Sequence, residues 1–86
     1  MLPIGNTPAN DRPAQIARYN ALCALLQHRF PSARFRFERL GRRAVAYLYA
    51  LPTDRVPLAA GVATGRGGDA LREAAGRAMH AAGFRA

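Results

Sequence analysis

The sequence predicts an α+β domain with the element order α-β-β-β-α, in which a three-stranded antiparallel sheet carries both helices on one face. Apolar residues recur at helical spacing through residues 10–30. Residues 33–50 then alternate between apolar and polar side chains around a Gly-Arg pair, as in a β-hairpin. An Ala-rich amphipathic segment over residues 69–82 predicts the second helix.

The first helix has recognisable ends. Asn10 or Asp11 can cap its N-terminus, Pro13 suits its first turn, and Pro31 ends it. Its apolar stripe consists of Ile16, Tyr19, Leu22, Cys23, Leu26 and Phe30. Residues 1–9 contain prolines and a glycine and are expected to form a flexible arm before a single domain over residues 10–86.

Gly41-Arg42 is expected to form a two-residue type II′ turn, which fixes the register of the hairpin. Phe35 and Phe37 then lie on the buried face, opposite Leu48 and Ala46. The other face carries two cross-strand pairs, Arg34 with Tyr49 and Arg36 with Tyr47. These pairs either stabilise the sheet or form an exposed face for stacking bases or docking a protein.

A third strand is expected over residues 56–64, with Pro57 marking an edge or a bulge. The second helix is expected from Asp69, its N-cap, to Ala82, with Gly83 stopping it and Phe84 folding back. Its buried face consists of Leu71, Ala74, Ala75, Ala78, Met79 and Ala82, which are small enough to let the helix lie close to the sheet.

The charge of the chain favours a polyanionic partner. The net charge is +8, all thirteen basic residues are Arg, and they are spread along the chain. A GC-rich genome explains the missing Lys but does not explain the net charge, because its codons do not suppress Asp or Glu. Nucleic acid or an acidic protein surface would suit this excess, and Arg stacks on bases and binds phosphate in a bidentate manner.

The segment Gly65-Arg66-Gly67-Gly68 joins the third strand to the second helix. Glycine amides at a helix start can bind a phosphate, with Arg66 and Arg72 adding charge. The alternative is a tight turn with no ligand. Asp69 favours this alternative, because its carboxylate would compete for the same amides.

The element order and the C-terminal third resemble a double-stranded RNA-binding domain. Gly61 and Gly65 are similar to the glycines of that family's third strand, and the matching helix positions are Ala70, Ala74, Ala75, Ala78 and Met79. The resemblance implies duplex-RNA contacts from the helix-two start (Arg66, Gly67, Gly68, Arg72), the hairpin tip (Arg42, Arg43) and helix one (Gln15, Arg18). The chain departs from the family where Gly67, Gly68 and Leu71 replace basic residues and where the hairpin loop is shortened.

Enzymatic chemistry is not expected. Cys23 is the only cysteine, His28 and His80 lie far apart in sequence, and Ser32 has no base at a recognisable spacing. We therefore predict no catalytic residues, no metal and no cofactor. With neither a membrane-spanning run nor a signal peptide, the expected setting is cytoplasmic.

The leading hypothesis is a non-enzymatic module that binds structured or double-stranded RNA, in preference to DNA, through phosphate and shape. The alternative is a protein-interaction module, such as a small phage-type inhibitor or adaptor that acts on a host nucleoprotein complex. Its contact face would be Arg34, Arg36, Tyr47 and Tyr49, which is also compatible with a homodimer.

Overall fold

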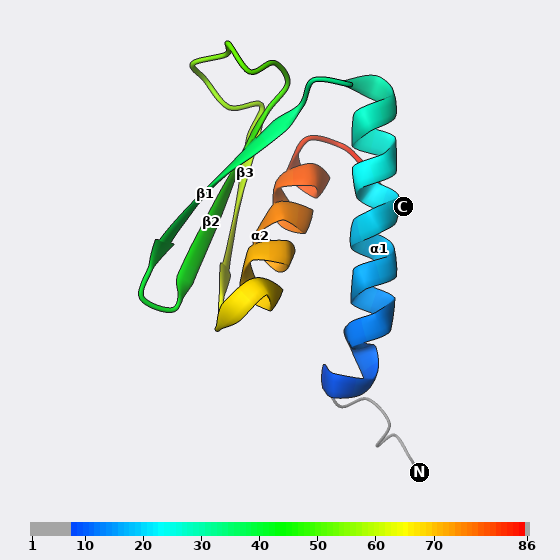
Figure 1. The fold of residues 1–86 in the computed structure, drawn as a ribbon, viewed down its shortest axis with the longest axis vertical. Helices are drawn as coiled ribbons and strands as arrows, with labels where there is room; N and C mark the ends of the chain where they lie inside the picture. Colours follow the sequence, from blue (N-terminus) through cyan, green and yellow to red (C-terminus); the bar gives the residue numbers. More distant parts are fainter. Residues whose placement is uncertain (1–7, 86) are drawn as a thin grey trace.

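A computed structural model of the chain describes the backbone of residues 8–85 and the side chains of residues 12–85. Its elements are α1 (Pro8–Arg29), β1 (Arg34–Leu40), β2 (Arg43–Tyr49), β3 (Ala59–Thr64) and α2 (Gly67–Ala81), as Figure 1 shows. This order confirms the predicted α+β class. The predicted arm was wrong at its end, because Pro8 and Ala9 belong to α1, and its residues 1–7 lie outside the described part of the chain.

The three strands form an antiparallel sheet in the order β1-β2-β3. Phe35 lies opposite Leu48 and Phe37 opposite Ala46, which confirms the predicted register. Gly41 has φ 62°, whereas no residue other than glycine has a positive φ in the described backbone. A positive φ at the first central position alone is the geometry of a type II′ turn, which confirms the expected turn.

Helix α2 lies directly on the sheet because both surfaces are rich in very small residues. A Cβ added to Gly61 on β3 would come within 2.2 Å of the carbonyl oxygen of Ala74 and 2.5 Å of the amide nitrogen of Ala78. The facing side of α2 is fully buried and consists of Ala70, Ala74, Ala75, Ala78 and Met79. Glycine at position 61 therefore sets the distance between the helix and the sheet.

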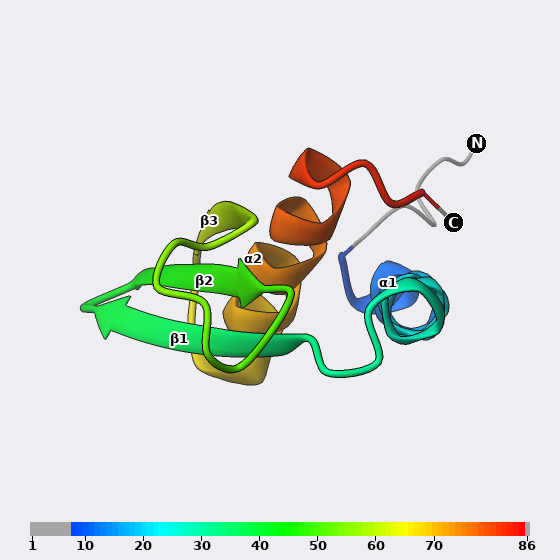
Figure 2. The same ribbon diagram turned by 90° about the horizontal axis from the view of Figure 1, so that it is seen from above.

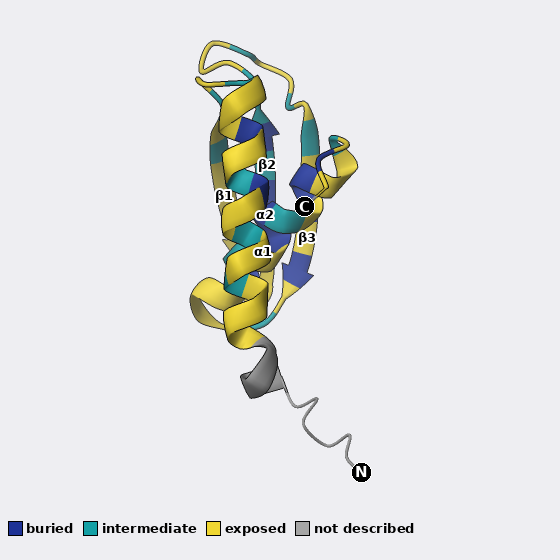
Figure 3. Cartoon of the chain, turned by 90° about the vertical axis from the view of Figure 1, so that its right-hand side faces the viewer, coloured by how far each residue is buried: buried dark blue, intermediate teal, exposed yellow. Residues whose placement is uncertain are grey.

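Helix α1 lies on the same side of the sheet as α2 but packs mainly against α2 (Figure 2). Among its residues 12–29, Leu22 and Leu26 are the buried side chains, and most of the surface is exposed (Figure 3). Because α1 does not cover β1, the ring of Phe37 is 42 % exposed, and its expected burial was wrong. Within residues 8–85 no helix is long and apolar enough to cross a membrane.

Two further element starts differ from the prediction. β3 begins at Ala59, three residues after Val56, because Pro57 has no amide hydrogen for a sheet and residues 51–58 form an irregular loop. Helix α2 begins at Gly67, with Arg66 as the N-cap, so Asp69 lies in the first helical turn and is not the cap.

The C-terminus of α2 ends as expected. Gly83 has φ 97°, its amide donates to the carbonyl of His80, and the amide of Phe84 donates to that of Met79. This is the paired hydrogen bonding of a Schellman motif. The Phe84 ring is thereby turned back onto Phe30 of the α1–β1 connection in an edge-to-face contact, with 6.2 Å between ring centroids. This contact joins the C-terminal segment to the end of α1.

Candidate nucleic-acid interface

Three segments that are far apart in sequence lie toward the same end of the molecule. The first turns of α1, the β1–β2 turn and the start of α2 all lie at the lower end of Figure 1. Each of these segments carries arginines, which are Arg12, Arg39, Arg42, Arg43, Arg66 and Arg72. We call this region the basic end.

Hydrogen bonds hold the hairpin against the β3–α2 connection. The amide of Gly65 donates to the carbonyl of Arg42 over 2.8 Å. From the inner face of β1, the Arg39 guanidinium donates to the carbonyl of Gly65 at 2.6 Å and approaches that of Gly67 at 3.5 Å. Arg39 therefore fixes the glycine-rich loop. Its position in the alternation, two residues after Phe37, is the sequence signal for an arginine on the inner face of the strand.

The start of α2 leaves its first backbone amides without a side-chain cap. Arg66 has extended backbone angles, and its side chain makes no capping hydrogen bond. Arg66, Gly67 and Gly68 are exposed. Amides in the first turn of a helix have no intrahelical acceptor, so these residues can present donors to an anion.

Asp69 of α2 is held by two arginines, one from α1 and one from its own helix. It is hydrogen-bonded to Arg12 of α1, and it accepts from Arg72 of α2 over 2.9 Å. These bonds lower the pKa of the Asp69 carboxyl below its ordinary value, and the bond from Arg12 has a larger effect than the bond from Arg72. Asp69 thus neutralises part of the basic end, and a phosphate would compete with it for Arg12 and Arg72. No sequence spacing pointed to Arg12.

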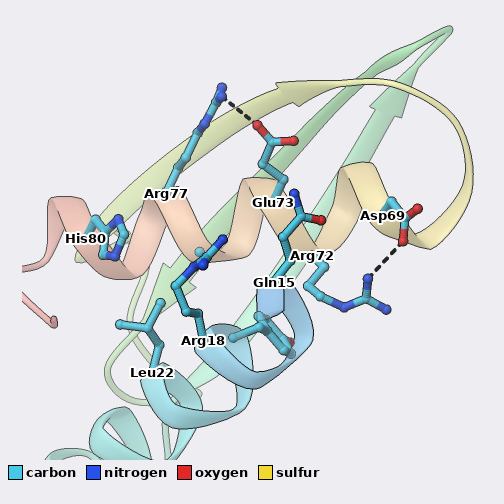
Figure 4. Close-up of a pocket in the computed structure, with 10 residues that line it drawn as sticks. Gln15, Arg18, Leu22, Asp69, Arg72, Glu73, Arg77 and His80 are labelled. Carbon is cyan, nitrogen blue, oxygen red and sulfur yellow. Dashed lines mark hydrogen bonds and ion pairs between the residues drawn. The ribbon is translucent and has the colours of Figure 1, made fainter. Parts of the chain in front are cut away.

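Beside this network runs a groove between α1 and α2, with a volume of about 290 Å³ (Figure 4). Gln15 and Arg18 of α1 lie on one side of it, and Arg72 of α2 lies on the other. Glu73 and Arg77 pair with each other at 2.6 Å along the same side of α2. The fold therefore gathers Gln15, Arg18 and Arg72 around one groove that continues from the basic end.

The outer face of the sheet, which no helix covers, holds a second set of candidate residues. Arg36 lies over the ring of Tyr47, with 5.1 Å to the centroid, and Glu38 binds both side chains, the Tyr47 hydroxyl at 3.0 Å and Arg36 at 3.5 Å. The hydrogen bond to Glu38 raises the pKa of Tyr47. Because Arg36 already covers the ring, a base stacking there would have to displace it.

Arg34 and Tyr49 lie at the other end of this face. They line a shallow hollow of about 460 Å³ together with Phe35, Arg36, Pro52, Asp54 and Arg55. This hollow is separate from the basic end, because β1 and β2 run between them (Figure 1). The fold thus divides the predicted residues between two sites.

The remaining polar groups do not gather into a site. In the part of the chain that the structure describes, no group of three His, Cys, Asp or Glu side chains could hold a metal ion. Cys23 is partly buried and packs against the core beside Tyr19, whose pKa is raised by burial and by Cys23. His28 and His80 are exposed.

Comparison with known proteins found no relative of the chain. No protein-family model matches the chain, and neither does any curated protein or solved structure. The resemblance to double-stranded RNA-binding domains therefore remains a hypothesis from the sequence.

Proposed function

We propose that the chain is a non-enzymatic nucleic-acid-binding module that contacts the phosphates of structured RNA through its basic end. The observation that carries this proposal is the hydrogen-bonded junction of hairpin, glycine loop and both helices. It holds arginines from three separate segments at the same end of the molecule. Such an arrangement matches a backbone with a regular spacing of negative charges.

Within this interface the residues would have distinct roles. Arg66 and the amides of Gly67 and Gly68 would receive one phosphate at the start of α2. Arg42 and Arg43 would contact a second phosphate from the turn of the hairpin. Gln15 and Arg18 extend the surface along α1, where a groove edge or a 2′-hydroxyl could be contacted.

The test measures fluorescence anisotropy with duplex RNA, single-stranded RNA and duplex DNA over a range of salt concentrations. Arg66→Gln combined with Arg72→Gln removes two charges from the basic end. The matched control is Arg55→Gln with Arg85→Gln, which removes two exposed arginines elsewhere. Losing two phosphate contacts should reduce the slope of log affinity against log salt by about 2, whereas the control should change it far less. Equal effects of both double variants would contradict the proposed interface.

A second candidate is a protein-interaction module that uses the outer face of the sheet. It is favoured by the exposed apolar side chains there, including Leu40 at 71 % and Val62 at 38 % exposure. Its contact residues would be Arg34, Arg36, Tyr47 and Tyr49. If Arg34→Glu with Tyr49→Ala abolished capture of a partner protein while leaving RNA affinity intact, this second function would be supported.

A further inference from the structure

The two edges of the sheet differ in which backbone groups they leave free. A two-residue hairpin is closed by a hydrogen-bonded pair, here Leu40 and Arg43. Backbone groups alternate in direction along a strand. The amides and carbonyls of Phe35, Phe37 and Arg39 therefore point away from β2, toward the free edge of β1.

The edge of β3 is covered at one backbone group by the chain itself. The amides of Gly65 and Leu58 donate to Arg42 and Leu48, so the even-numbered residues of β2 face β3. The same alternation directs the carbonyl of Val62 outward, and the Arg77 guanidinium of α2 donates to it over 2.6 Å. An arginine on a free edge hinders pairing with another strand.

The edge of β1 has no such cover. Among residues 8–85, no hydrogen bond from another element reaches the outward backbone groups of Phe35, Phe37 or Arg39. The half-exposed Phe37 ring stacks on Phe35 with 5.7 Å between centroids. This edge thus combines unpaired backbone groups with an apolar side chain open to contact, as strand-addition sites do.

We propose that the partner for this edge is a second copy of the chain, paired antiparallel through β1 with Phe37 opposite Phe37 across a two-fold axis. The strand sequence Arg34–Leu40 is complementary to itself in this register. Arg36 faces Glu38 of the second copy, and Glu38 faces Arg36. Phe35 faces Arg39 of the second copy on the inner side.

Alternation of the backbone favours the same register. Phe37, Phe35 and Arg39 all direct their amides and carbonyls outward, so the Phe37–Phe37 pair and the two Phe35–Arg39 pairs would form about six main-chain hydrogen bonds. The exposed Phe37 rings would meet on the inner face. The neighbouring registers are worse. If Phe35 lay on the two-fold axis, Arg34 of one copy would face Arg36 of the other. If Arg39 lay on the axis, Arg36 would face Arg42.

The experiment uses charge reversal and rescue. In Glu38→Arg the β1 edge carries arginines at positions 36 and 38, and in Arg36→Glu it carries glutamates at both. In a dimer of either variant alone, positions 36 and 38 of the two copies would face each other with like charges at both places. In a dimer of one variant with the other, they would face each other with unlike charges at both places. Sedimentation velocity up to about 100 µM, where a weak dimer of about 10 µM affinity is largely formed, should show a wild-type dimer. Each single variant should dimerise about tenfold more weakly, so that its dimer dissociates at about tenfold higher concentration than the wild-type dimer, and the equimolar mixture of the two should form a heterodimer.

Two further variants keep the test decisive if a single variant folds poorly. The double exchange Arg36→Glu with Glu38→Arg restores unlike pairs and should recover the dimer. Arg85→Glu, an equal change of charge away from β1, should leave it intact, and circular dichroism checks folding throughout. A monomeric wild-type chain at about 100 µM would overturn the proposal, and so would a dimer that is insensitive to these exchanges.

Discussion

The backbone of Gly61 on β3 touches the backbone of Ala74 on α2, so that no side chain fits between them. A Cβ at position 61 would lie 2.2 Å from the carbonyl oxygen of Ala74 and 2.9 Å from the Cβ of Arg77. Backbone atoms cannot move aside as the end of a flexible side chain can. The approach of α2 to the sheet therefore depends on this single glycine.

Gly61→Ala should destabilise the domain by about 3 kcal/mol or more, since α2 would have to lift off the sheet to admit one methyl group. Urea unfolding followed by circular dichroism measures the change. Gly76→Ala is the matched control. It lies within α2, where an added Cβ meets nothing within 4 Å, and should stabilise the domain by about 0.5–1 kcal/mol. Equal effects at the two positions would show that the close approach does not limit packing.

Asp69 should contribute to stability above pH 3.8 and lose that contribution as the pH falls. Arg12 and Arg72 lower its pKa in the folded state, whereas the unfolded chain keeps the ordinary value of 3.8. The unfolded state therefore binds the proton first on acidification, and the stabilisation disappears as the pH falls through the lowered value. The difference in unfolding free energy between wild type and Asp69→Asn should be constant above pH 3.8 and shrink below it. A difference independent of pH would contradict the ion pairs.

Asp69→Asn should also strengthen RNA binding, if phosphates bind at the basic end. The carboxylate holds Arg12 and Arg72 and adds a negative charge beside the start of α2. Removing that charge frees two cations and should steepen the dependence of affinity on salt. Anisotropy titrations of wild type and variant against one duplex RNA measure this. Asp54→Asn, in the β2–β3 loop at the other end of the molecule, is the control and should have a much smaller effect.

Tyr19 and Tyr47 should ionise above the ordinary tyrosine pKa of 10.0, for different reasons. Burial first, and then Cys23, raises the pKa of Tyr19, whereas the hydrogen bond to Glu38 raises that of Tyr47. Their contribution to stability is therefore fully present below pH 10 and is lost as the pH rises through the raised values. Alkaline titration of phenolate absorbance in wild type, Tyr19→Phe and Tyr47→Phe assigns each step. Glu38→Gln should lower the pKa of Tyr47 and leave that of Tyr19 unchanged.

Local rules were sufficient for the hairpin and for the buried face of α2. Gly41 at the first turn position determines the turn, the turn determines the register, and the register places Arg36 beside Tyr47. The alanines of α2 were predictable because small residues at helical spacing beside a glycine strand indicate close packing. Both inferences rest on interactions between residues near in sequence or on one repeating pattern.

The failures at Phe37 and Asp69 came from contacts between distant segments. Nothing in the sequence indicated that α1 would pack on α2 and leave Phe37 exposed, because an apolar stripe does not specify which surface covers it. Asp69 resembled an N-cap, but its carboxylate is held by Arg12 from the other helix. The candidate site was predictable in its positions on α2 and the hairpin. The participation of Arg12 and Arg39 depended on the tertiary structure.

The hydrogen bond from Arg77 to the edge of β3 has a consequence for how far the chain can polymerise. In the terms of polymer chemistry, a chain with two reactive ends extends without limit, whereas a chain with one reactive end stops after a single coupling. Arg77 hinders coupling at the edge of β3, because it occupies the outward carbonyl of Val62, and this favours β1 as the edge that couples in the proposed dimer. Any pairing through β1 then ends in a closed assembly with a fixed number of copies instead of a fibril.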